Sequence, residues 1–141
     1  MFDVHDCIGF LTNHGAKAVG EAMNQQFKKK DLTRVQWMAL YYIDQKGAMT
    51  QKELAAAMMI SEPSAAHLAE RLLQGELIRR EGCAENYRVK LLSLTEKGKA
   101  ALDELFPLVE QFNRQGTQGI SHQDLETFKR VMAQMVQNVQ E

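Results

Sequence analysis

The cysteines and histidines are the side chains of this sequence that could bind a metal ion or react with an oxidant. His5 and Cys7 stand two residues apart near the start of the chain. Metal sites are usually marked by pairs such as Cys-x-x-Cys or His-x-x-x-His, and neither spacing occurs here. Further ligands would have to come from His14, His122 or a second chain. We therefore expect no metal or other cofactor, and a metal- or haem-responsive site stays open as an alternative.

Several classes of protein are disfavoured by what the sequence lacks. It contains no glycine-rich phosphate loop, no nucleophile elbow and no HExxH motif, so we expect no enzyme. No apolar run approaches the roughly 20 residues that cross a bilayer. The first ten residues include two acids and no lysine or arginine, unlike a secretory signal. Two cysteines cannot form a disulfide framework, and we expect a cytoplasmic protein that does not bind membranes.

Charge is distributed unevenly along the chain, although the net charge is only -1. Residues 28–99 contain 13 lysines and arginines against 9 acids, whereas the remaining residues contain 4 against 9. A basic middle between acidic ends is typical of a nucleic-acid-binding module flanked by helices that do not contact nucleic acid. The charge pattern therefore favours a nucleic acid as a partner.

The apolar periodicity and the capping signals predict helices over the first half of the chain. Residues 4–27 have apolar side chains at helical spacing, and Thr33 with Gln36 opens a second helix over 34–45. After a short extended piece at 48–50, Thr50 and Glu53 open a helix to about residue 58. Ser61 then caps a helix to about residue 74. Two short helices joined by a tight turn predict a helix-turn-helix.

The second half of the chain predicts a β-hairpin followed by two helices. Residues 77–80 and 88–94 have partial strand alternation and are separated by polar, turn-forming residues. Thr95 caps a long helix, in which Pro107 predicts a bend over 103–107. Ser121 opens the last helix, whose apolar side chains are spaced three and four apart. That stripe favours pairing with a second chain.

The element order α-α-β-α-α-β-β-α-α describes a mainly α-helical winged helix-turn-helix with a small β-wing, and it resembles the MarR (multiple antibiotic resistance regulator) family. Four stretches have the residues that the family favours, in the same order and at matching spacing. They are Leu32-Thr33-x-x-Gln36-Trp37-x-x-Leu40, Thr50-Gln51-Lys52-Glu53-Leu54-Ala55, Ser61-x-Pro63-Ser64 with Leu77-Ile78-Arg79-Arg80, and Asn86-Tyr87-Arg88 with Leu94-Thr95-x-x-Gly98.

Three positions depart from the family pattern. Asn86 stands where the family usually has an aspartate that orients the wing arginine, so Arg88 loses a charged neighbour. Glu62 stands where a basic or polar residue is common, and its charge repels phosphate. Glu76 replaces a usual glycine, while Gly75 lies one residue earlier, so the end of the preceding helix is expected to differ.

The resemblance implies a homodimer that regulates transcription, most simply as a repressor, on a pseudo-palindromic operator. The N- and C-terminal helices, residues 1–30 and 100–141, would form the dimerisation region, and residues 31–99 the DNA-binding module. The second helix of the motif would enter the major groove and the wing would contact the minor groove and phosphates. The implied DNA contacts are Ser64, Ala65, His67, Arg71, Arg88, Lys52, Arg79, Arg80 and Lys90.

The family also implies a signal that releases the DNA. A small-molecule effector would bind in a cleft lined by Phe10, His14, Trp37, Tyr41 and Tyr42, although aromatic residues on a buried helix equally serve as core. Cys7 lies about two residues from the reactive cysteine of the family's peroxide sensors and is the candidate for redox sensing. A winged helix that mainly binds protein partners remains the other alternative, because an acid begins the recognition helix.

Overall fold

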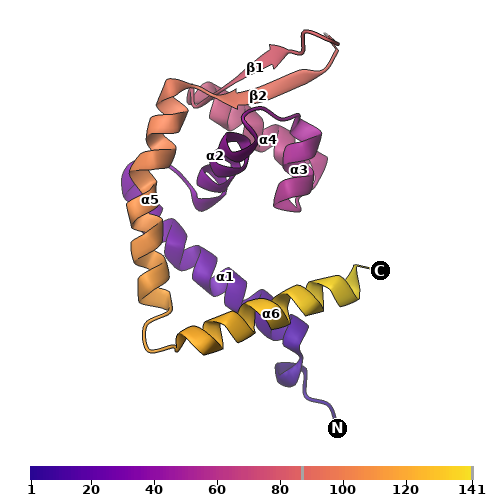
Figure 1. Cartoon of the computed structure of the whole chain (residues 1–141), viewed down its shortest axis with the longest axis vertical. Coiled ribbons are helices and arrows are strands. Elements are labelled where there is room, and N and C mark those ends of the chain that lie inside the picture. Colours follow the sequence, from indigo (N-terminus) through magenta and orange to yellow (C-terminus); the bar gives the residue numbers. More distant parts are fainter. Residues whose placement is uncertain (87, 141) are drawn as a thin grey trace. The chain divides into compact units, whose positions relative to one another are not determined.

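The computed structural model describes residues 1–86 and 88–140 of the chain (Figure 1). In chain order, its elements are the 3-10 turn η1 (Val4–Asp6), α1 (Ile8–Phe27), the 3-10 turn η2 (Lys28–Lys30), α2 (Arg34–Lys46), α3 (Gln51–Met58), α4 (Glu62–Gln74), β1 (Ile78–Gly82), β2 (Lys90–Leu94), α5 (Glu96–Gly116) and α6 (His122–Val139). The contacts divide the chain into two compact units, Met1–Phe106 and the residues from Pro107 onward. The domain bounds expected from the sequence stay a prediction.

Local side-chain hydrogen bonds begin most of these helices where the sequence predicts them. Thr33 and Gln36 form a capping box at α2, and Ser61 accepts from the Ser64 N–H at α4. The first helix differs from its prediction. Residues 4–6 form the separate turn η1, capped by Asp3, and α1 begins only after Cys7, whose backbone is extended.

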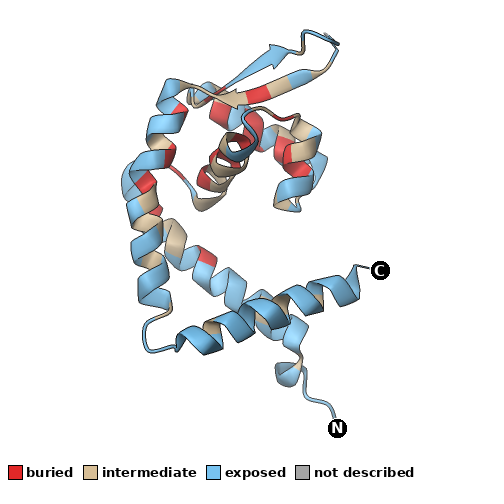
Figure 2. Cartoon of the chain, in the orientation of Figure 1, coloured by how far each residue is buried: buried red, intermediate tan, exposed pale blue. Residues whose placement is uncertain are grey.

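The core of the first unit lies where α2, α3, α4 and β2 meet, and Figure 2 shows buried residues concentrated there. Leu40, Leu54, Leu72 and Leu92 are almost completely buried, one from each element. Burying each of these side chains stabilises the fold by about 1.5–3 kcal/mol relative to exposing it. This apolar core fixes the surfaces of α3 and α4 that stay exposed.

The tight turn between α3 and α4 completes the helix-turn-helix. Met59 takes the left-handed conformation (φ 56°) and ends α3, with its N–H bonded to the Ala56 carbonyl. The Ile60 N–H bonds to the Ala55 carbonyl at 3.0 Å, so the chain reverses within three residues. Ser61 then caps α4.

The wing is the antiparallel pair of β1 and β2, and Figure 1 shows it projecting beside α3 and α4. Its register pairs Ile78 with Leu94 and Gly82 with Lys90. The extended piece predicted at 48–50 forms a single bridge between Met49 and Leu92. That bridge attaches the edge of β2 opposite β1 to the segment that precedes α3.

The base of the wing packs very closely against the start of α5. Thr95 donates its hydroxyl to the Glu76 carbonyl (2.6 Å) and its N–H to the Leu77 carbonyl (3.1 Å). The same hydroxyl accepts from the Gly98 N–H at 3.0 Å. A Cβ on Gly98 would lie 1.9 Å from the Leu77 carbonyl oxygen, so only glycine fits. The Leu94-Thr95-x-x-Gly98 motif therefore joins the end of α4, the wing and α5.

The end of α4 is formed by Gly75 and Glu76, and whether it differs from the family pattern stays a prediction. Glu76 takes the left-handed conformation (φ 58°), which glycine adopts most easily, whereas Gly75 is right-handed. Bonds from the Glu76 N–H to the Leu73 carbonyl and from the Leu77 N–H to the Leu72 carbonyl close the helix end. The chain thus makes this turn at the cost of backbone strain in Glu76.

The two last helices are α5, which continues through Pro107, and α6, which begins at the Ser121 cap. A bend of α5 over 103–107 stays a prediction. Among the residues that the structure describes, none in α6 is buried, and Phe128 and Val139 are exposed on this helix. No helix in the described part of the chain has the length and apolarity to cross a membrane.

Candidate nucleic-acid interface

The exposed face of α4 presents most of the side chains that the sequence assigned to it. Leu68, Ala69 and Leu72 face the core, and Ser64, His67 and Arg71 are exposed on the other side of the helix. Ala65 is a correction, because it is completely buried and cannot contact a base. It lies one turn before the buried Leu68 and Ala69, so the helical spacing places it with the core.

A hollow that we call the wing groove lies between α4 and the wing. Its lining combines the start of α3, one side of α4 and parts of both wing strands: Thr50, Gln51, Lys52, Glu62, Ala66, Glu70, Arg80, Arg88, Val89, Lys90 and Leu92. Four of the predicted DNA contacts are therefore brought together in one place. Positive charges in a concave, polar surface attract a phosphate backbone more strongly than isolated surface charges do.

Arg80 is held within the wing groove by two neighbours from different elements. Its guanidinium lies 3.3 Å from the Glu70 carboxylate of α4 and donates to the Gln51 side-chain oxygen of α3 at 3.2 Å. An arginine with both partners keeps a defined orientation. The arrangement fixes the wing base against the helix-turn-helix.

Arg79 points to the other side of the wing, because successive side chains of a strand alternate. Its guanidinium contacts Ser93 (3.3 Å) and Glu81 (3.5 Å), and it lines a separate hollow with Asp44 and Lys99. The structure does not bring Arg79 together with the other predicted DNA contacts. We therefore leave Arg79 out of the proposed interface.

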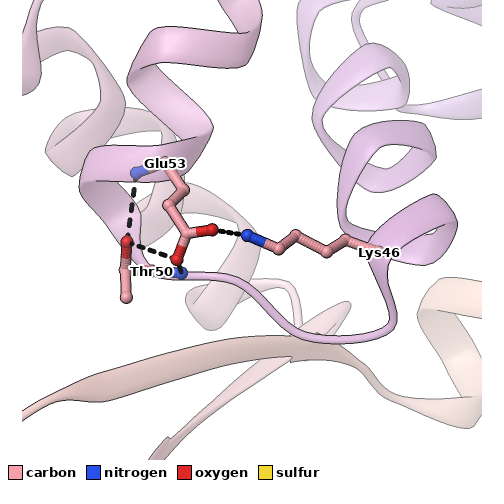
Figure 3. Close-up of polar contacts among 3 residues, drawn as sticks. All are labelled: Lys46, Thr50 and Glu53. Carbon is pink, nitrogen blue, oxygen red and sulfur yellow. Dashed lines mark hydrogen bonds and ion pairs between the residues drawn. The ribbon is translucent and has the colours of Figure 1, made fainter.

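The position of Lys52 and Gln51 depends on the start of α3, shown in Figure 3. The Thr50 hydroxyl accepts from the Glu53 N–H, and the Glu53 carboxylate accepts from the Thr50 N–H and hydroxyl. The same carboxylate pairs with Lys46 at the end of α2. The Thr50-x-x-Glu53 motif thus connects the end of α2 to the start of α3. Its polar groups already have hydrogen-bond or ion-pair partners within the protein.

The wing loop orients Arg88 through its backbone. The Asn86 side-chain oxygen accepts from the Arg88 N–H at 3.1 Å, and the Asn86 carbonyl accepts from the Val89 N–H. Tyr87, part of the same sequence motif, lies outside the described residues. Asn86 therefore shapes the loop by the hydrogen bond that an aspartate would also make, and the Arg88 side chain is exposed.

Glu70 and Gln51 belong to the wing groove, and sequence reasoning did not select them. The signal for Glu70 was available, because Glu62, Ala66 and Glu70 recur every four residues and must share one side of α4. Arg80 contacts Gln51 and Glu70, which come from two other elements of the chain. No local sequence pattern predicts these contacts.

The aromatic residues of the predicted effector cleft fall into two separate groups. Trp37 is buried, donates its indole N–H to the Leu102 carbonyl (3.2 Å) and stacks on Tyr41. Tyr42 makes an edge contact with Tyr41. Phe10 and His14 lie exposed on α1. Trp37 and Tyr41 are thus part of an aromatic core, and a single cleft lined by all five residues stays a prediction.

In the part of the chain that the structure describes, the cysteines and histidines belong to no cluster of side chains that could hold a metal ion. His5 bonds to the Asp3 carboxylate at 3.0 Å and contacts the Phe10 ring edge-on. Cys7 is half-buried between η1 and α1. Redox sensing through Cys7 stays a prediction.

Comparisons with known proteins agree with this architecture. The MarR family model matches residues 32–90. The chain is similar to a mutant of MarR from E. coli in complex with operator DNA, with a TM-score of 0.87 and 18% identity over 95% of this chain and 99% of that chain. It is similar to BpsR of Bordetella bronchiseptica, whose DNA binding is regulated by 6-hydroxynicotinic acid (TM-score 0.89, 20% identity, 96% and 97% covered). A probable transcriptional regulator from Pseudomonas aeruginosa is 26% identical (TM-score 0.80, 94% and 99% covered). The predicted winged helix-turn-helix fold is confirmed.

Proposed function

We propose that this chain, whose residues 32–90 match the MarR family model, is a homodimeric regulator of transcription that binds specific sequences in double-stranded DNA. The observation that carries the proposal is the wing groove, in which Lys52, Arg80, Arg88 and Lys90 gather beside the exposed face of α4. Two similar structures support the same activity: MarR from E. coli in complex with operator DNA, and MepR from S. aureus in complex with DNA.

In the proposed complex α4 lies in the major groove and the wing follows the backbone. Ser64, His67 and Arg71 can each form a hydrogen bond to a base edge or a phosphate. The exposed Arg88 side chain extends from the wing toward a narrow minor groove, whose negative potential attracts it. The lysines of the wing groove neutralise phosphates and release counterions, so affinity falls as salt rises.

Dimerisation is supported by apolar side chains that the single chain leaves in solvent. On α1 and the residues before it these are Val4, Ile8, Phe10, Leu11 and Val19, and on α6 they are Phe128, Val131, Val136 and Val139. Exposed apolar stripes on helices of this length usually mark an interface. A two-fold dimer would present two α4 helices to a pseudo-palindromic operator, with half-sites about one helical turn apart.

We test dimerisation by light scattering coupled to size-exclusion chromatography. Phe128→Glu places a charge in the apolar stripe of α6, and we expect it to shift the protein from dimer toward monomer. Gln134→Glu adds the same charge on an exposed, polar side of the helix and should leave the dimer intact. A wild-type protein that elutes as a monomer at micromolar concentration would overturn the dimer.

DNA binding is tested with duplexes from the region upstream of the protein's own gene, by fluorescence anisotropy over a salt series. Wild-type protein should bind one such duplex at least about 1,000-fold more tightly than random DNA, as specific regulators do. Arg88→Ala and His67→Ala should weaken that binding, and Arg79→Ala, a change of the same charge on the other side of the wing, should not. No preference over random DNA would favour a module that binds protein partners.

We propose further that the protein acts as a repressor and that a small ligand or a stress signal releases it from DNA. The ligand-regulated DNA binding of BpsR supports this part. A thermal-shift screen identifies compounds that raise the melting temperature of the dimer, and each one is then added to the protein–DNA complex. A compound that binds the protein without lowering its DNA affinity is not the signal.

A further inference from the structure

The wing groove contains two carboxylates among its positive charges, and they differ in their surroundings. Glu70 is 3.3 Å from the Arg80 guanidinium, so its charge is compensated within the protein. Glu62 forms no ion pair among the described residues, although it lines the same hollow as Lys52, Arg88 and Lys90. Glu70 therefore has an ion-pair partner within the protein, whereas the charge of Glu62 is available to a ligand that binds in the groove.

Glu62 is also not needed to cap α4. Ser61 accepts from the Ser64 N–H at 3.2 Å, and the two serine hydroxyls bond to each other at 2.8 Å. Glu62 is the first residue of the helix and is exposed, and Ala66, one turn later on the same side, is too short to cover it. Its carboxylate thus stays available at the end of α4 that contacts base edges in helix-turn-helix proteins.

The chemistry of the base edges decides what this carboxylate can bind. An ionised carboxylate only accepts hydrogen bonds, and a phosphate repels it. In the major groove the donors are the N4 amino group of cytosine and the N6 amino group of adenine. Adenine places the acceptor N7 beside its amino group, and guanine and thymine present acceptors at that edge. Cytosine is therefore the base that an unpaired carboxylate prefers.

We propose that Glu62 determines specificity by accepting a hydrogen bond from the N4 amino group of one cytosine in each half-site. The inference rests on the proposed DNA-binding function and adds a base preference to it. Glu62, which departs from the family pattern, would thus favour operators that have cytosine at this position. Its carboxylate would disfavour guanine and thymine there, because it repels their acceptor atoms.

The experiment compares the sequence preferences of variants of the full-length protein. Wild-type protein selects duplexes from a random-sequence pool, and binding is then measured on the selected duplex with each base changed in turn. We expect a symmetric cytosine at which guanine or thymine costs about tenfold in affinity for each half-site. Glu62→Ala should lose the preference at that position alone. Glu62→Gln should move it toward adenine, because glutamine pairs with the N6 and N7 atoms of adenine.

Glu96→Gln is the matched control, because Glu96 is likewise the first residue of a helix, α5, but lines a hollow away from the wing groove. It should select the wild-type sequence. Melting curves establish that the variants fold. If the wild type selects an operator and both Glu62 variants keep its preference at every position, the inference fails while the proposed function stands. If the wild type selects no sequence at all, the proposed function fails.

Discussion

Replacing Gly98 by alanine gives the sharpest test of how the wing base is built. A Cβ at this position would lie 1.9 Å from the Leu77 carbonyl oxygen and 2.9 Å from its carbonyl carbon. Since real Cβ contacts stay beyond 3.0 Å, α5 and the segment at Leu77 must separate by more than about 1 Å. Both sides of this contact are backbone, so no side-chain rotation can relieve it.

The cost of that separation can be added up from the contacts it breaks. Steric strain of this kind costs about 1–3 kcal/mol. The bonds from Thr95 to the Leu77 and Glu76 carbonyls contribute about 1 kcal/mol each, and the movement strains both. Alanine recovers about 0.5–1 kcal/mol through its better helix propensity. We expect Gly98→Ala to lower the free energy of unfolding by about 2–4 kcal/mol.

Urea denaturation at one fixed protein concentration measures this loss, because a dimer's stability depends on concentration. Gly75→Ala is the matched control in the same neighbourhood. Gly75 has right-handed dihedral angles, and a Cβ there would lie 3.5 Å from the nearest atom, an ordinary contact. Its stability should stay within about 0.5 kcal/mol of wild type. A Gly98→Ala protein with the wild-type urea midpoint would refute the close approach of α5 to Leu77.

Three further predictions concern the groove and the backbone around it. Lys90→Ala should weaken operator binding and reduce the slope of log K against log salt by about 1, whereas Arg79→Ala should leave that slope unchanged; equal slopes measured by anisotropy would contradict a phosphate contact by Lys90. Glu76→Gly should raise the free energy of unfolding by about 0.5–1 kcal/mol, because glycine adopts φ 58° without strain; a lower urea midpoint would contradict this. Thr50→Ala should lose about 1–2 kcal/mol in thermal unfolding by removing the cap of α3, while Thr50→Ser keeps the hydroxyl and should be nearly neutral; equal losses would show that the cap contributes nothing.

The helix starts could be predicted from the sequence because their causes are local. These N-cap hydrogen bonds join residues three apart, as at Thr33 with Gln36 and at Ser121 with Asp124. Four consecutive residues are therefore enough to predict where the helix begins. The start of α1 was wrong for a related reason. The apolar period continues through residues 4–8, but Asp3 caps the short turn η1, and the chain is extended at Cys7.

The candidate site was less predictable, because it depends on which side of each element faces the groove. Arg79 and Arg80 are adjacent and equally basic, and strand alternation puts them on opposite sides of the wing. Only the folded chain shows that Arg80 is the one on the groove side. The prediction that Ala65 contacts DNA is wrong, because its spacing from Leu68 and Leu72 places it on the buried side of α4. The contact of Arg80 with Glu70 and Gln51 joins three elements and required the folded chain.

The residues that carried the family resemblance explain why the fold was easier to infer than the operator. Thr50, Glu53 and Thr95 direct their polar groups into the protein, where each is already hydrogen-bonded, and Gly98 is required by close packing. A group satisfied inside the protein gains little by contacting DNA, since binding would exchange one hydrogen bond for another. In the proposed complex, base preference must therefore come from side chains that stay exposed, such as Glu62, Ser64 and His67. A sequence can keep these internally bonded and closely packed residues and still bind a different operator, so the resemblance to the family does not predict which DNA sequence this chain selects.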